Sequence, residues 1–153
     1  IAAEVARMAA GIGMTVLAWN RTPKAHAGVT FVPIERLLAE SHVVSLHLLL
    51  NDETCGFLSA TRIATMRRGA ILVNTARGAL VDQAALIAAL EAGHLRHAAM
   101  DVFAVEPLPP DHPFVRMPNV TLSAHAAFLT PEASDNLIAA ALDHCRRIAA
   151  AVP

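Results

Sequence analysis

The stretch GAILVNTARGALVDQAALIAAL, residues 69–90, contains the alternation on which the fold prediction rests. Residues 70–74 are an apolar run typical of a buried strand, and polar residues follow it at once. Asp82 is suited to begin a helix over residues 83–92, because its carboxylate can accept a backbone N–H of the first turn. Gly93 is placed to end that helix. The stretch therefore predicts a strand followed by a helix.

The same alternation extends over most of the chain. Further strands are expected at residues 14–19, 30–32, 43–49, 98–102 and 120–122. Further helices are expected at residues 1–10, 34–40 and 59–66, and from Thr130 onward. The 43–49 run is almost continuously apolar, as expected when both faces of a strand are covered. The alternation predicts an α/β fold, a doubly wound parallel sheet with helices on both faces.

Composition excludes several classes of protein. The chain has 153 residues, the size of one domain, and with 55% hydrophobic and 16% charged residues it is too apolar to be disordered. Its apolar runs fall well short of the roughly 18 residues that a membrane span needs. A net charge of −1 gives no basic field for nucleic acid. Cys55 and Cys145 show no metal-like spacing, so we expect a reducing, cytoplasmic location and no metal site.

Polar residues follow several of the expected strands. They are Asn20 and Arg21, residues 74–78, Asp101 and His125. In open parallel sheets, ligands bind in the crevice beyond the carboxyl ends of the strands. These residues are therefore the first candidates for a site.

Three stretches resemble the nicotinamide-binding domain of the D-isomer-specific 2-hydroxyacid dehydrogenases. They are GAILVNTARGALVD at 69–82, AMDVFAVEPLP at 99–109 and PNVTLSAH at 118–125. Their order and spacing fit, and the resemblance covers essentially the whole chain. It implies a Rossmann-like fold and an NAD(P)-dependent oxidoreductase that interconverts small 2-keto acids, such as glyoxylate or hydroxypyruvate, with D-2-hydroxy acids.

The resemblance also implies three catalytic positions. Arg77 falls where the family holds the substrate carboxylate and carbonyl, Glu106 on the glutamate, and His125 on the acid/base histidine. The chemistry agrees, because hydride transfer needs a cofactor and the alkoxide that forms needs a proton, which histidine can give near neutral pH. A nearby carboxylate favours the protonated imidazole, and an arginine fork can grip a carboxylate in two places.

The cofactor-binding positions follow from the same resemblance. Ala2 would occupy the third small-residue position of the Gly-x-Gly-x-x-Gly/Ala fingerprint, and Asp101 would contact the nicotinamide side. The implied set is Ile1, Ala2, Asn20, Arg21, Leu48, Thr75, Ala76 and Asp101.

Asn20 and Arg21 bear on the choice of cofactor. The strand that ends here often carries an Asp, which binds the ribose 2′-hydroxyl and repels a 2′-phosphate. The neutral amide of Asn20 removes that repulsion, and Arg21 can pair with the phosphate. We therefore expect NADP, with NAD remaining possible.

Several family features are missing from the chain. The glycine-rich loop and the strand before it would lie upstream of Ile1, as would most of the substrate domain. We expect residues 1–129 to be an incomplete dinucleotide-binding domain and residues 130–153 to be a helix that packs on the substrate domain. The chain would then be an inactive fragment of a longer, homodimeric dehydrogenase. Residues 126–128 (Ala-Ala-Phe) replace the glycines usual after the histidine, which would narrow the pocket.

Two other interpretations remain open. One is a non-catalytic, nucleotide-binding regulatory module of the same family. The other is a relative of the β-hydroxyacid dehydrogenases, which share the Asn-Arg-Thr turn but use a catalytic lysine. Lys24 is the only lysine in the chain and follows that turn.

Overall fold

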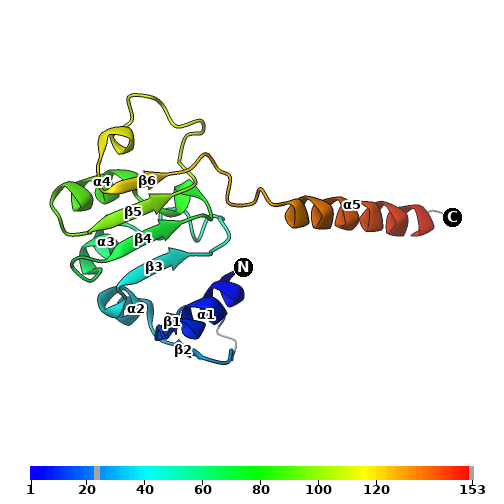
Figure 1. Cartoon of the computed structure of the whole chain (residues 1–153), viewed down its shortest axis with the longest axis horizontal. Coiled ribbons are helices and arrows are strands. Elements are labelled where there is room, and N and C mark those ends of the chain that lie inside the picture. Colours follow the sequence, from blue (N-terminus) through cyan, green and yellow to red (C-terminus); the bar gives the residue numbers. More distant parts are fainter. Residues whose placement is uncertain (23–24, 152–153) are drawn as a thin grey trace.

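A computed structural model describes residues 1–22 and 25–151 (Figure 1). The Asn-Arg-Thr turn at residues 20–22 is described, whereas Lys24 lies outside the described residues.

The elements follow the expected order along the chain. The strands are β1 (Val16–Ala18), β2 (Val29–Phe31), β3 (Val43–Leu46), β4 (Ile71–Asn74), β5 (His97–Met100) and β6 (Val120–Leu122). The helices are α1 (Ala2–Gly11), α2 (Ile34–Glu40), α3 (Ala60–Thr65), α4 (Gln83–Glu91) and α5 (Pro131–Ala151). Two short 3₁₀ helices, η1 (Gly78–Leu80) and η2 (Pro113–Arg116), were not predicted. The strand expected at 43–49 ends earlier, at Leu46.

The strands form two parallel sheets. One sheet pairs β1 with β2, and the other has the order β3-β4-β5-β6. The predicted α/β class with a parallel sheet and flanking helices is confirmed. The carboxyl ends of β3 to β6 point toward the side from which α5 extends, and the chain's N-terminus lies on that side too (Figure 1).

A groove of about 920 Å³ lies between β1 of one sheet and β3 of the other. It is lined by β1 and β3 and by residues of α1 and α2. Among the described strands, β1 pairs only with β2, and β3 pairs only with β4. One backbone edge of β1 and one of β3 are therefore not paired within a sheet.

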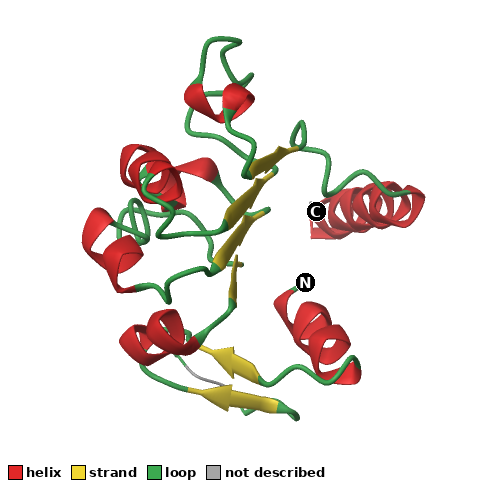
Figure 2. Cartoon of the chain, turned by 60° about the vertical axis from the view of Figure 1, so that its left-hand side comes forward, coloured by secondary structure: helices red, strands yellow, loops and turns green. Residues whose placement is uncertain are grey.

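The core lies between the four-stranded sheet and α2, α3 and α4. Each of these helices contributes a side chain that is at most 2% exposed, namely Leu38, Ile63 and Leu86. They pack in one cluster with Leu72 of β4 and Met100 of β5. Figure 2 shows these three helices together on one side of the sheet.

The opposite face of the sheet is more open than the sequence suggested. On β3, Val44 and Leu46 are buried, whereas Val43 is 40% exposed and Ser45 is exposed. The prediction that both faces of this strand are covered is wrong for the described chain. The physical reason is that α2 to α4 cover one face only, while α1 lies beside β1 and α5 projects away (Figures 1 and 2).

The last helix carries an unburied apolar stripe. Leu137, Ile138, Leu142 and Ile148 of α5 are each between 51% and 72% exposed. Within residues 1–22 and 25–151, no helix combines the length and apolarity needed to cross a membrane.

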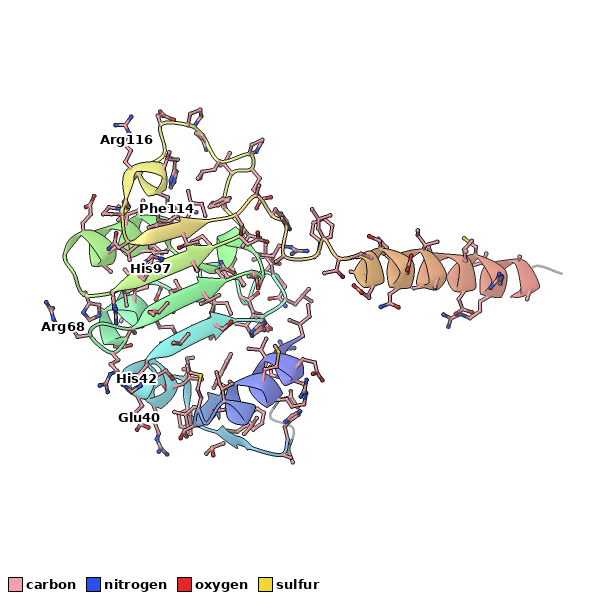
Figure 3. The ribbon with its side chains drawn as sticks, in the orientation of Figure 1. Glu40, His42, Arg68, His97, Phe114 and Arg116 are labelled. Carbon is pink, nitrogen blue, oxygen red and sulfur yellow. The ribbon has the colours of Figure 1, made fainter. Side chains whose placement is uncertain are left out.

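Side chains beside β6, at the edge of the four-stranded sheet, show the same division between core and solvent. Phe114 of η2 is 1% exposed and belongs to the core, whereas Arg116, two residues on, is exposed and points outward (Figure 3). η2 thus closes the core beside β6.

Gly78 brings together the loops that follow β4 and β5. A Cβ atom at this position would lie 2.0 Å from the carbonyl carbon of Phe103. Only a residue without a side chain allows the two backbones to approach so closely. This contact places Arg77 against the loop that contains residues 101–106.

We expect Gly78→Ala to force these backbones apart. Overpacking of this kind costs about 1–3 kcal/mol of the free energy of unfolding. Urea denaturation would measure the loss. Gly11→Ala is the matched control, because no atom lies within 4 Å of the added Cβ there. Equal stability of the two variants would contradict the close-approach argument.

Candidate active site

The side chains of His125 and Glu106 are in hydrogen-bond contact in the loops beyond β6 and β5. The imidazole Nδ1 lies 2.7 Å from the carboxylate Oε2, and the two side chains are 40% and 36% exposed. His125 has a φ of +51°, a left-handed conformation that is uncommon outside glycine. Its backbone N–H donates to the carbonyl of Asp101 at 2.8 Å, which holds that conformation. The turn thus presents the imidazole to Glu106 and to solvent.

Glu106 is oriented through both of its oxygens. Its Oε1 accepts the backbone N–H of Phe103 at 2.9 Å, while Oε2 contacts the imidazole. The hydrogen bond with His125, aided by the Phe103 N–H and the charge of Arg77, lowers the pKa of Glu106 below its usual value. Glu106 is therefore ionised near neutral pH, and Nε2 of His125 is the nitrogen that can exchange a proton with a substrate.

Asp101 is a buried carboxylate, 3% exposed, that organises the histidine loop. Its Oδ1 accepts the Ser123 hydroxyl at 2.5 Å and the Ala126 N–H at 2.9 Å, and its Oδ2 accepts the Ala127 N–H at 3.0 Å. Burial by itself raises the pKa of Asp101, but these hydrogen bonds outweigh it and the pKa falls below its usual value. The sequence pointed to a cofactor contact at Asp101 and missed this role, although a carboxylate at a buried strand end must find donors.

Asn74 shapes the loop that carries Arg77. Asn74 is fully buried at the end of β4; its Oδ1 accepts the Ala76 N–H and its Nδ2 donates to the Arg77 carbonyl, both at 3.0 Å. Its own carbonyl accepts the Asp101 N–H at 3.0 Å, which links the two loops. Arg77 is exposed and donates to the Ala76 carbonyl at 2.6 Å. Its positive charge contributes to the lowered pKa of Glu106.

Phe128 stands against the imidazole. Its ring meets that of His125 edge to face with centroids 6.0 Å apart, and the side chain is 60% exposed. This is the position where the sequence suggested a narrower pocket, and the aromatic ring does border the histidine.

Five of the eight residues expected to bind a cofactor fall into two groups. Thr75, exposed, and Ala76, half-buried, lie between Asn74 and Arg77 and so belong with the catalytic candidates. Ala2, Asn20 and Leu48 line the groove between the sheets.

Arg21 and Ile1 belong to neither group. Arg21 is exposed in the loop after β1 and pairs with Glu53. Ile1 is 94% exposed, so the structure does not bring it into either group. Across the described ranges, no cluster of three or more His, Cys, Asp or Glu side chains is arranged to hold a metal ion.

Comparison with known proteins gives a consistent match. Residues 1–127 match the family model for the NAD-binding domain of D-isomer specific 2-hydroxyacid dehydrogenases. A glyoxylate reductase from Korarchaeum cryptofilum is 45% identical over 136 residues, which are 86% of this chain and 41% of the relative. The chain thus spans less than half of that relative's length.

Solved structures agree with the sequence match. A D-isomer specific 2-hydroxyacid dehydrogenase from Xanthobacter autotrophicus, solved with NADPH and MES, is 42% identical with a TM-score of 0.87, covering 99% of this chain and 63% of that one. The NAD complex of a corresponding enzyme from Lactobacillus delbrueckii is 29% identical with a TM-score of 0.89, covering 97% of this chain and 50% of that one. The fold is therefore shared with enzymes crystallised with either nicotinamide cofactor.

We expect Asp101→Asn to loosen the loop that carries His125. The amide provides one acceptor where the carboxylate provides two, so a part-buried backbone N–H of the loop loses its partner, at a cost of about 1 kcal/mol. Because the folded-state pKa of Asp101 is lowered, its stabilisation is complete above the ordinary value of about 3.9 and is lost as the pH falls through the folded value.

Urea denaturation at pH 7 and near pH 3 would measure both effects. The difference between Asp101→Asn and the unmodified protein should shrink at the lower pH. Asp111→Asn, at an exposed loop position, is the matched control and should change little. Equal effects of the two substitutions at pH 7 would show that Asp101 does not hold the loop.

Proposed function

The chain belongs to the D-isomer specific 2-hydroxyacid dehydrogenase family, and we propose that the protein containing it reduces a small 2-keto acid to a D-2-hydroxy acid. The observation that carries this proposal is the His125–Glu106 pair, with Nδ1 and Oε2 2.7 Å apart and the charge of Arg77 nearby. Family membership sets aside the β-hydroxyacid dehydrogenase interpretation and its lysine chemistry.

Each of the three side chains has a distinct task in this reaction. The Arg77 guanidinium binds the substrate carboxylate and orients the adjacent carbonyl, because its planar fork matches a carboxylate. His125 donates a proton from Nε2 to the carbonyl oxygen as it gains negative charge. Glu106 accepts from Nδ1, fixes the ring and stabilises the protonated imidazole. In the reverse direction, the same nitrogen accepts the hydroxyl proton.

The residues present fit a nicotinamide cofactor, which supplies or accepts the hydride when bound. Asn20 follows β1 and Leu48 follows β3, the two strands that border the groove. The N-terminal end of α1 lies on the side of the carboxyl strand ends (Figure 1), where a helix attracts phosphate. Thr75 and Ala76 would lie against the nicotinamide side.

We propose NADP as the preferred cofactor. Asn20 and Arg21, both exposed after β1, offer a neutral amide and a cation to the ribose, and neither repels a 2′-phosphate. The Xanthobacter relative was crystallised with NADPH, which agrees with this preference, whereas the Lactobacillus one was crystallised with NAD. Glyoxylate and hydroxypyruvate are the proposed substrates, since one relative is named glyoxylate reductase.

We further propose how segments outside these 153 residues complete the dinucleotide-binding domain. Residues 1–129 form part of the dinucleotide-binding domain, and an additional strand followed by the glycine-rich loop fills the groove between β1 and β3. Residues 130–153 pack on a substrate domain, as the exposed stripe of α5 suggests. On this proposal the 153-residue chain alone is inactive.

We also propose a homodimer and a cytoplasmic location. Met8 and Ile12 of the α1 region are 55% and 80% exposed, an apolar surface suited to a homodimer contact. Cys55 and Cys145 are both free and exposed, which suits a reducing cytoplasm.

The acid/base proposal is tested with His125→Gln in the full-length protein that contains this chain. Reduction of glyoxylate and hydroxypyruvate by NADH and NADPH should fall about 10²- to 10⁴-fold in kcat, because the proton donor is lost. His144→Gln, an exposed position on α5, is the control and should retain activity. Full activity of His125→Gln would remove the acid/base assignment.

The cofactor proposal is tested with Arg21→Ala. The kcat/KM for NADPH should fall about tenfold, the scale of a lost hydrogen bond to a charged group, while that for NADH changes little. Arg147→Ala is the control, because Arg147 is likewise exposed and paired with a carboxylate, Asp143. A clear preference for NADH in the unmodified protein would end the NADP proposal.

A further inference from the structure

Glu53 is a site residue that the sequence did not single out. Its carboxylate Oε2 pairs with Nη1 of Arg21, 32 positions away in the sequence. Arg21 lies in the loop after β1 and Glu53 in the loop after β3, the two strands that line the groove. The proposed cofactor arginine therefore already has an anionic partner.

The backbone of Glu53 is held by a hydrogen-bonded turn. Oδ1 of Asn51 accepts the N–H of Glu53 at 3.1 Å and that of Thr54 at 3.0 Å. The Thr54 hydroxyl donates to the Leu49 carbonyl at 2.6 Å. These bonds fix the turn, so the carboxylate of Glu53 projects from a defined position.

The loop of Arg21 is joined to the same turn by aromatic packing. The rings of Trp19 and Phe57 lie 4.9 Å apart at 31°. The guanidinium of Arg62 covers Phe57 at 4.1 Å and donates to its carbonyl at 2.8 Å. This stack connects the residues just before Arg21 with those just after Glu53, and it keeps the two charged side chains within reach of each other.

We propose that Glu53 is a specificity-determining residue that reduces the protein's preference for a 2′-phosphorylated cofactor. This inference rests on the proposed role of Arg21. Glu53 occupies one nitrogen of the guanidinium and places a negative charge beside the position of a 2′-phosphate, which carries nearly two negative charges. The 2′-hydroxyl of NAD is uncharged and is not repelled.

The effect is limited because both partners are exposed, at 73% and 67% of their side chains. Exposed ion pairs change equilibria by only about two- to fivefold. Glu53 therefore moderates the choice and leaves Arg21 able to bind a phosphate. The preference for NADPH over NADH is therefore smaller than it would be with Arg21 but without Glu53.

Glu53→Gln in the full-length protein that contains this chain tests the inference, since it keeps the shape of the side chain and removes its charge. The ratio of kcat/KM for NADPH to that for NADH should rise about two- to fivefold at low salt. Calorimetric titration with adenosine 2′,5′-bisphosphate should show tighter binding, while adenosine 5′-monophosphate should bind as before. Asp52→Asn, the neighbouring exposed carboxylate, is the control for a general change of charge.

The same substitution in an Arg21→Ala background separates the possible outcomes. Glu53→Gln should then raise the ratio by less than it does when Arg21 is present, because only the direct repulsion of the phosphate remains to be removed. Suppose that Arg21→Ala lowers the ratio. The inference about Glu53 is then overturned, while the NADP proposal stands, if Glu53→Gln does not change the ratio, changes it equally with and without Arg21, or changes it only as much as Asp52→Asn does. If Arg21→Ala does not alter the ratio, the NADP proposal itself fails.

Discussion

The buried carboxylate of Asp101 is the interaction on which the arrangement of the candidate active site depends. A charge removed from water must be compensated by donors, and here those donors are Ser123, Ala126 and Ala127. Because they flank His125 on both sides, satisfying the carboxylate also fixes the histidine backbone in its left-handed conformation. The position of the imidazole is thus a consequence of burying an anion at the end of β5.

The other loops are coupled to this one through backbone contacts. Asn74 accepts from Asp101 and shapes the turn that presents Arg77, while the close approach of Gly78 to Phe103 joins the same two loops. Arg77, Glu106 and His125 follow three different strands, so their distance along the chain does not by itself bring them together. This small set of hydrogen bonds and one missing side chain join the loops, so the loops that carry the three candidates are organised mostly by other residues.

The sequence predicted the strands and helices well where the pattern was local. The run at residues 70–74 and the Asp82 cap describe β4 and α4, and Asp82 does accept the N–H of Ala85 at 3.0 Å. The catalytic candidates came from the family resemblance, and their roles stay proposals. Local patterns could not show the open face of β3, because coverage depends on where distant helices lie. Neither could they show the Arg21–Glu53 pair, which depends on how two loops meet in space.

The unpaired edges of β1 and β3 have a consequence for handling the 153-residue chain in isolation. Each edge presents backbone N–H and C=O groups that are ready to accept another extended segment, and the lining between them is largely apolar. Natural sheets protect such edges with charge, proline or a covering element. Left open, these edges favour self-association into aggregates during refolding at high concentration.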